Sequence, residues 1–187
     1  MTTNPHVRLP GDRSYDERVK QMIRVNHAGE YGARRIYAGQ LAVLGKSAAA
    51  PALKEMADQE EQHLEVFSDM MVRRKVRPTA LMPLWHVAGY ALGAATALLG
   101  EKAAMACTVA VESVIDEHYA RQEKELGTDD PELKSTVTRF RADEKEHHDM
   151  AQSYILANGE EPSPFYHILT HMVVYQTKLA IWLSTRI

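Results

Sequence analysis

DQEEQH, at residues 58–63, has a counterpart in DEKEHH, at residues 143–148. Both contain the pattern Glu-x-x-His, at Glu60–His63 and at Glu144–His147. Three residues turn an α-helix by about 300°, so the carboxylate and the imidazole of each pair lie on one face, where they can bind a metal ion together. By themselves the two pairs are weak evidence, because solvated charged helices also produce this spacing by chance.

Two isolated glutamates strengthen the metal hypothesis. Glu30 lies among small and apolar residues in VNHAGEYGARRIYAGQLAVLG, residues 25–45, and Glu112 lies in the apolar run 109–115. A buried carboxylate is unfavourable unless it is paired or bound to a cation. Glu30 precedes Glu60 by 30 residues and Glu112 precedes Glu144 by 32. The chain therefore contains the order Glu, then Glu-x-x-His, twice.

This repeat predicts the fold. Each half, at about residues 14–77 and 101–159, reads as a helical hairpin, and convincing strand signals are absent. Two hairpins form a four-helix bundle, the di-iron or di-manganese carboxylate arrangement of ferritin-like proteins. Two cations would neutralise the buried carboxylates. The predicted metal ligands are Glu30, Glu60, His63, Glu112, Glu144 and His147.

The repeat extends to residues beside the ligands. Tyr37 and Tyr119 each follow the isolated glutamate of their half by seven residues, close to two helical turns. One interpretation is a core tyrosine whose hydroxyl bonds a ligand carboxylate; the other is that Tyr119 is catalytic and positions substrate or passes electrons. Asp143 could orient a ligand histidine. The matching residue of the first half is Gln59, so the two metal ions are not expected to be equivalent.

Length and composition indicate one globular domain over residues 1–187. The chain is 45% hydrophobic and 25% charged, and its net charge of −3 gives no reason to expect nucleic-acid binding. Its one cysteine, Cys107, excludes an internal disulfide and a multi-cysteine zinc or iron–sulfur site, and suits a reducing compartment. The first 20 residues do not read as a Sec signal, and residues 1–13 are expected to be flexible.

Local signals predict about six helices. Ser14 with Glu17 forms a capping box for the first helix, Pro78 is expected to stop the second, and Asp130 with Pro131 begins the fifth. The predicted spans are about 14–45, 51–77, a helix within 83–100, 101–126, 131 to 158 or 159, and 163 to the end of the chain.

Residues 78–100, PTALMPLWHVAGYALGAATALLG, contain no Asp, Glu, Lys or Arg. Read alone, the stretch is long enough for a transmembrane helix; the alternatives are a core helix or one lying on a bilayer surface. A single span here would put the two hairpins on opposite sides of the membrane, which is incompatible with one shared site. Interfacial attachment is therefore favoured. Gly89, Gly93 and Ala97 recur every four residues, so another helix can approach closely.

Five stretches resemble the demethoxyubiquinone hydroxylase family: IRVNHAGEYGARRIYAGQLAVLG, RPTALMPLW, ALGAATALLG, AMACTVAVE and FRADEKEHHDMA. The resemblance covers nearly the whole chain from about residue 22 to residue 187. It implies that all six predicted ligands carry over, and that Tyr119 occupies a family position near the site.

The resemblance also implies a reaction and its setting. The enzyme would hydroxylate the ring of a polyprenylated demethoxyubiquinone, in its quinol form, using O2 at a di-iron(II) centre, a late step of ubiquinone biosynthesis. Reducing equivalents would come from NADH or from reduced quinone. The expected location is peripheral, on the cytoplasmic face of the bacterial inner membrane or the matrix face of the mitochondrial one. Expected partners are the quinone, the membrane surface, a homo-oligomer, and a ubiquinone-biosynthesis complex or lipid-binding protein.

Three alternatives fit the residues less well. A ferroxidase or iron-storage protein of the same fold needs a hydrophilic outer surface, against which the apolar helices argue. A rubrerythrin-like peroxidase needs four cysteines. A purely structural membrane-associated bundle leaves six buried ligand-type side chains unexplained. Fold alone does not decide among these classes.

Overall fold

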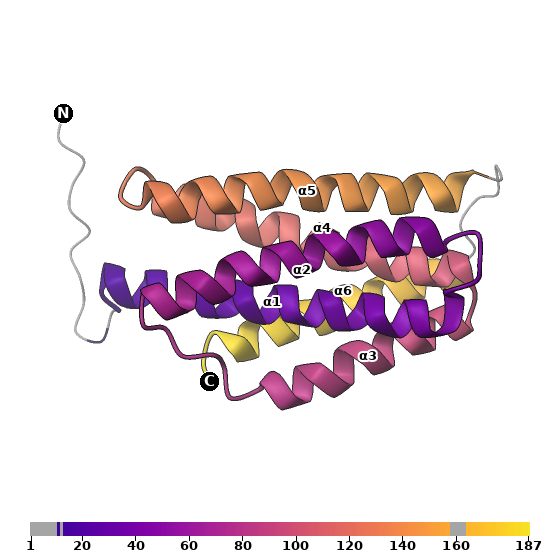
Figure 1. Ribbon diagram of the computed structural model, residues 1–187, viewed down its shortest axis with the longest axis horizontal. Helices are drawn as coiled ribbons and strands as arrows, with labels where there is room; N and C mark the ends of the chain where they lie inside the picture. Colours follow the sequence, from indigo (N-terminus) through magenta and orange to yellow (C-terminus); the bar gives the residue numbers. More distant parts are fainter. Residues whose placement is uncertain (1–10, 12, 158–163) are drawn as a thin grey trace.

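The computed structural model describes residues 11, 13–157 and 164–187, which contain six α-helices and no strand (Figure 1). The all-α prediction is therefore confirmed. The helices are α1 (Tyr15–Leu44), α2 (Ala50–Arg73), α3 (Met82–Leu98), α4 (Glu101–Leu126), α5 (Pro131–Leu156) and α6 (Pro164–Ser184).

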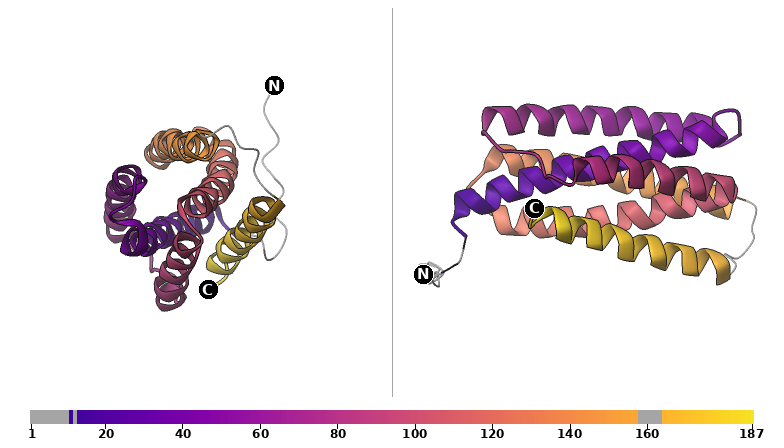
Figure 2. Two further views of the ribbon diagram at one scale, coloured as in Figure 1. Left: turned by 90° about the vertical axis from the view of Figure 1, so that its right-hand side faces the viewer. Right: turned by 90° about the horizontal axis from the view of Figure 1, so that it is seen from below.

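Four of the helices form a ferritin-like bundle. Helix α1 packs on α2, and α4 packs on α5, so each half of the repeat is a hairpin, as predicted. The end-on view in Figure 2 shows α1, α2, α4 and α5 around a common axis. Helices α3 and α6 lie outside this bundle, on the side away from α5, where α3 packs mainly on α1 and α6 mainly on α4.

Helix boundaries follow the predicted capping signals, with one correction. The Ser14 hydroxyl and the Glu17 carboxylate form the capping box of α1, and the Asp130 carboxylate accepts the Leu133 N–H at the start of α5. Helix α2, however, ends at Arg73, before the predicted stop at Pro78. The physical reason is tertiary: Lys75 adopts a left-handed conformation with φ of 53°, while Arg74 bonds the carboxylates of Asp130 and Glu132.

Helices α1 and α3 pack closely because glycines on each helix face the backbone of the other. A Cβ atom built on Gly93 would lie 1.9 Å from the Ile36 carbonyl oxygen, and one built on Gly39 would lie 2.2 Å from the Tyr90 carbonyl oxygen. Only glycine permits this distance between the backbones. The small-residue pattern of α3 thus marks a helix contact, and its partner is α1.

The buried apolar side chains form two clusters along the bundle. One includes Ile23, Phe67 and Phe140, and the other includes Leu53 and Met105. In α1, α2 and α5 the predicted metal ligands lie between the two clusters in the sequence, whereas in α4 members of the first cluster flank Glu112 on both sides. The clusters therefore hold the four helices in register on both sides of the ligands.

Large apolar side chains on α3 and α6 face outward. Val87 and Leu98 of α3 are 65% and 74% exposed, and Ile168 and Tyr175 of α6 are 66% and 71% exposed. Across the described residues, no helix combines the length and the apolar character needed to cross a membrane. The predicted flexibility of residues 1–13 and the predicted end of the fifth helix at 158 or 159 fall largely or wholly outside the described residues.

Candidate metal centre

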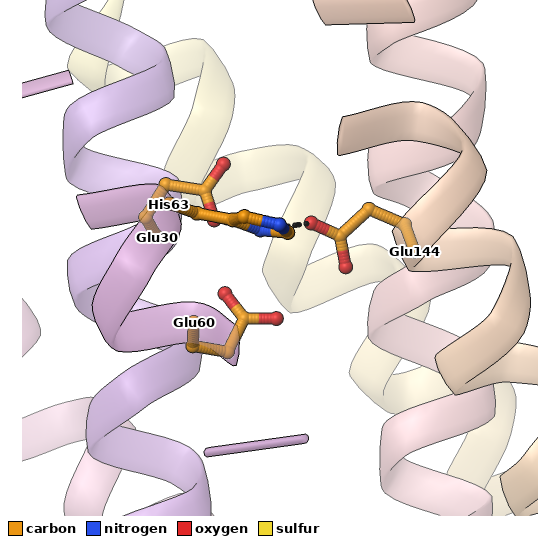
Figure 3. Close-up of side chains that lie close together, drawn as sticks. All are labelled: Glu30, Glu60, His63 and Glu144. Atoms are coloured by element: carbon orange, nitrogen blue, oxygen red, sulfur yellow. Dashed lines mark ion pairs between the residues drawn. The ribbon is translucent and has the colours of Figure 1, made fainter. Parts of the chain in front are cut away.

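The structure brings all six predicted ligands together inside the bundle. Helix α1 contributes Glu30, α2 contributes Glu60 and His63, α4 contributes Glu112, and α5 contributes Glu144 and His147. Every one of them is buried. They form two groups whose candidate ligand atoms lie within 4.8 Å of one another: Glu30, Glu60, His63 and Glu144, and Glu60, Glu112, Glu144 and His147. Figure 3 shows the first group, with Glu144 of α5 facing His63 of α2.

Both imidazoles point one nitrogen into the cluster and the other away from it. The Nδ1 atom of His63 lies 3.3 Å from a Glu144 oxygen, and that of His147 lies 3.3 Å from oxygens of Glu60 and Glu144. On the outer side, His63 Nε2 bonds Asp143 at 3.0 Å. His147 Nε2 bonds the Gln59 amide oxygen at 2.5 Å. Because both outer partners accept hydrogen bonds, Nε2 is the donor on that side and Nδ1 is the nitrogen left to face a metal ion.

Hydrogen bonds from tyrosines hold the two isolated glutamates. The Tyr37 hydroxyl donates to Glu112 at 2.8 Å, and the Tyr119 hydroxyl donates to Glu30. Each tyrosine thus bonds the glutamate of the opposite half of the repeat. The hydroxyl–carboxylate contact was predicted from the sequence, but its crossed pairing was not.

The charges of the cluster are not balanced by protein side chains alone. Burial, followed by repulsion from Glu144, holds the pKa values of Glu60 and Glu112 well above their usual range. Burial also acts to raise the pKa of Glu144, but the neighbouring imidazoles of His147 and His63 outweigh it and lower that pKa to about 2. Burial lowers the pKa of His63, whereas Glu144 and Glu30 raise it, to about 10. Without cations, the site must therefore retain protons.

The donor set fits two divalent cations. The atoms without hydrogen-bond partners include both oxygens of Glu60, one oxygen each of Glu112 and Glu144, and the Nδ1 atoms of both histidines. Such buried unsatisfied groups are rare in folded proteins and call for a ligand. Four carboxylates and two imidazoles suit iron or manganese. Glu60 and Glu144 belong to both groups, so they are the ligands able to bridge two ions.

An apolar cavity of about 520 Å³ lies between α1, α3, α4 and α6. Its walls include Gly29 of α1 and Val111 of α4, the immediate sequence neighbours of Glu30 and Glu112. The absent side chains of Gly29 and Gly32 leave room on the α1 wall. The cavity can therefore hold a flat apolar group next to the ligands, with further apolar chain along α3 and α6.

A polar network that sequence reasoning missed lies one helical turn from Glu30 and Tyr119. Buried Asn26 and Gln122 bond each other at 2.8 Å, and both bond His118 Nε2. Burial lowers the pKa of His118 to about 4, so this imidazole is neutral. His118 directly precedes Tyr119 in the sequence, but its amide partners had no signal there. Cys107 is fully buried, and burial raises its thiol pKa to about 12.

Residues 17–184 match the model of a family described as ubiquinone biosynthesis protein COQ7. The chain is 51% identical to a Rhodospirillum rubrum protein named 3-demethoxyubiquinol 3-hydroxylase, over 96% of this chain and 84% of that protein. It is 50% identical to the human mitochondrial NADPH-dependent 3-demethoxyubiquinone 3-hydroxylase, over 90% of this chain and 78% of the relative. It is 40% identical to the mitochondrial 5-demethoxyubiquinone hydroxylase of Saccharomyces cerevisiae, over 90% of this chain and 78% of that relative.

Proposed function

Because the chain belongs to the family of the ubiquinone biosynthesis protein COQ7, we propose that its six buried ligands hold two iron ions that serve ring hydroxylation. The protein is a hydroxylase of ubiquinone biosynthesis that acts on the demethoxyubiquinone ring. The observation that carries the metal proposal is the convergence of four carboxylates and two imidazoles with unsatisfied inward-facing atoms.

The reaction places one oxygen atom of O2 on the ring carbon in place of hydrogen. The second oxygen atom leaves as water, which requires two electrons and two protons. Bound ferrous ions supply the activation of O2. Glu60 and Glu144 would bridge the two ions, while Glu30 with His63 and Glu112 with His147 would complete the separate positions. We propose a reduced nicotinamide nucleotide or reduced quinone as the electron source; the human relative's name specifies NADPH.

The apolar cavity is the proposed site of the quinone ring and of the first part of its polyprenyl tail. Its small-residue wall, at Gly29 and Gly32, directly adjoins Glu30 on α1. The tail would leave between α3 and α6, whose outward faces are apolar. The protein's own groups therefore exclude water from the ring and orient it toward the ligands.

We also propose that α3 and α6 lie on a membrane surface, since a polyprenyl substrate dissolves in the bilayer. Cations flank this apolar surface: the Arg35 guanidinium lies over Tyr90 at 4.9 Å, and that of Arg186 lies over Trp182 at 3.8 Å. They suit anionic headgroups. The proposed location is the inner membrane, cytoplasmic in bacteria or facing the matrix in mitochondria. A homo-oligomer and a lipid-binding or biosynthetic-complex partner remain predictions.

Membrane binding is expected to resist salt, because burial of apolar side chains is insensitive to ionic screening. A wash in 1 M salt should leave most of the protein on vesicles. The double variant Val87→Glu/Ile168→Glu should bind at least about a hundredfold more weakly, since each residue loses roughly 1.5–3 kcal/mol of apolar burial. Val72→Glu is the matched control: Val72 is 79% exposed on α2, which contacts neither α3 nor α6. Complete release of the unmodified protein by salt would refute apolar attachment.

Tyr119→Phe is expected to lower turnover by about tenfold or more without loss of iron, as is usual for partners of metal ligands. The change removes the hydroxyl that bonds Glu30 and leaves the fully buried ring in place. Tyr37→Phe is the matched variant, because Tyr37 makes the equivalent bond to Glu112. Turnover and bound iron are measured together on both variants. Unchanged turnover in Tyr119→Phe with intact iron would exclude a catalytic role for Tyr119.

Stability of the metal-free protein is expected to fall as pH rises from about 5 to 9. The pKa values of Glu60, Glu112 and His63 are raised on folding and outnumber those of His118 and His27, which burial lowers, so the folded state binds more protons than the unfolded state in this window. Each such proton lowers the free energy of unfolding by about 1.4 kcal/mol per pH unit. Metal replaces these protons, so stabilisation by metal should grow with pH. Calorimetry of chelator-treated and iron-loaded samples measures how the stability of each form changes with pH. A Tm of the metal-free protein that rises with pH would contradict the raised pKa values of the cluster.

The hydroxylase proposal is tested under anaerobic conditions. The purified protein is loaded with Fe(II), supplied with a demethoxyubiquinone analogue and NADH, and then exposed to 18O2. The expected product is heavier than the substrate by one 18O atom. Oxidation and retention of iron with an untouched quinone would instead support the ferroxidase alternative.

A further inference from the structure

The two proposed metal positions are closely matched, which makes their one difference informative. Position 1 consists of Glu30, His63 and the shared Glu60 and Glu144; position 2 consists of Glu112, His147 and the same two shared residues. Each position thus has one unshared carboxylate and one imidazole. The shared glutamates cannot distinguish the positions by charge.

The unshared carboxylates are also equivalent. Glu30 and Glu112 are both buried, and each accepts a hydrogen bond from a fully buried tyrosine hydroxyl, Tyr119 or Tyr37. A neutral donor therefore attenuates the charge of both carboxylates in the same way. No difference in metal affinity arises from this pair.

The outer partners of the imidazoles differ in charge. His63 Nε2 bonds the Asp143 carboxylate at 3.0 Å, whereas His147 Nε2 bonds the neutral amide oxygen of Gln59 at 2.5 Å. A carboxylate that accepts the outer N–H makes the inner nitrogen a stronger donor to a metal ion than an amide does. The Asp143 side chain is 35% exposed, which attenuates this effect without removing it.

We propose that position 1 fills first and binds its ion more tightly than position 2, and that Asp143 and Gln59 set this order. The inference rests on the proposed two-metal function of the cluster. Because outer partners of metal-binding histidines change affinity by about 10–100-fold, the two dissociation constants should differ by about tenfold or more. Asp143 and Gln59 are positioning residues: each acts on the metal only through a histidine.

Anaerobic titration of the metal-free protein with Co(II), followed by visible absorption in competition with a chelator, measures the two binding steps. Two near-isosteric variants change only the outer charge. Asp143→Asn should weaken the tight step by about tenfold and bring the two constants together. Gln59→Glu should tighten the weak step by a similar factor. The double variant should reverse the order of filling.

Ligand variants identify which step belongs to which position. His147→Ala should retain the tight step and lose the weak one, and His63→Ala should do the reverse. Equal constants in the unmodified protein, or a ratio unchanged by Gln59→Glu, would overturn the inference. Circular dichroism checks that each variant folds. If Asp143→Asn does not fold, the result with Gln59→Glu alone tests the proposed order of metal binding. Failure of the folded protein to bind any Co(II) would instead overturn the proposed metal centre.

Discussion

Glu112→Ala is expected to abolish ring hydroxylation. Glu112 is the one unshared carboxylate of its proposed metal position, is 2% exposed, and has an oxygen without a hydrogen-bond partner that faces the cluster. Alanine supplies no ligand, so this position keeps only His147 and the two shared glutamates. The loss should exceed the roughly 10–100-fold that removal of an outer partner causes, because a ligand itself is removed.

The variant should nevertheless fold. Removing Glu112 ends the burial of this carboxylate and its repulsion by Glu144, which together raise the pKa of Glu112, and this partly offsets the lost bond from Tyr37. Formation of 18O-labelled quinone, bound iron and Tm are measured on the same preparation. Glu65→Ala, an exposed glutamate on α2, is the control and should retain full activity. An activity of Glu112→Ala within tenfold of the unmodified protein would contradict the assignment of this ligand.

Gly93→Val is expected to destabilise the protein by about 3 kcal/mol or more, the upper range for overpacking. Even the first added carbon would lie 1.9 Å from the Ile36 carbonyl oxygen, and backbone cannot rotate away as a side chain can. Helix α3 must therefore move away from α1. For a chain of this length the corresponding fall in Tm is roughly 6–12 °C. Activity should fall as well, because α1 and α3 both form walls of the proposed substrate cavity.

Gly32→Ala separates overpacking from a general effect of substituting helical glycine. Gly32 lies in α1, the helix that Gly93 faces, and it lines the proposed substrate cavity. A Cβ atom on Gly32, however, meets nothing within 4 Å. Alanine should therefore raise the free energy of unfolding by up to about 1 kcal/mol through helix propensity. Thermal melts of both variants provide the comparison. A Gly93→Val protein that melts like the unmodified chain would show that α3 does not need its close contact with α1.

The bundle could be predicted because its signals are periodic and local. The recurrence of Glu and Glu-x-x-His defines two similar hairpins, and the apolar surroundings of Glu30 and Glu112 place those carboxylates inside. The structure accordingly brings all six residues together. The early end of α2 at Arg73 had no comparable signal, since it depends on Arg74 reaching Asp130 in another helix.

Relative helix rotation is what the sequence leaves open. Seven-residue spacing puts Tyr119 on the same face as Glu112, but only the packing of α4 against α1 brings its hydroxyl to Glu30. Predicting the Asn26–Gln122 pair and the apolar cavity would also require knowing how the helices are rotated relative to one another. The glycines of α3 predicted a close contact but could not identify α1 as the partner.

The hydrogen bonds between α2 and α5 have a mechanical consequence for the whole bundle. Direct packing between α2 and α5 is sparse, yet Asp143 of α5 bonds His63 of α2, and Gln59 of α2 bonds His147 of α5. Ions shared by Glu60 and Glu144 would join the same two helices. On that side of the bundle, these polar bonds therefore join α2 to α5 together with the ring contact between Phe67 and Phe140. Each of these bonds joins a residue of one hairpin to a residue of the other, so neither hairpin can form them alone.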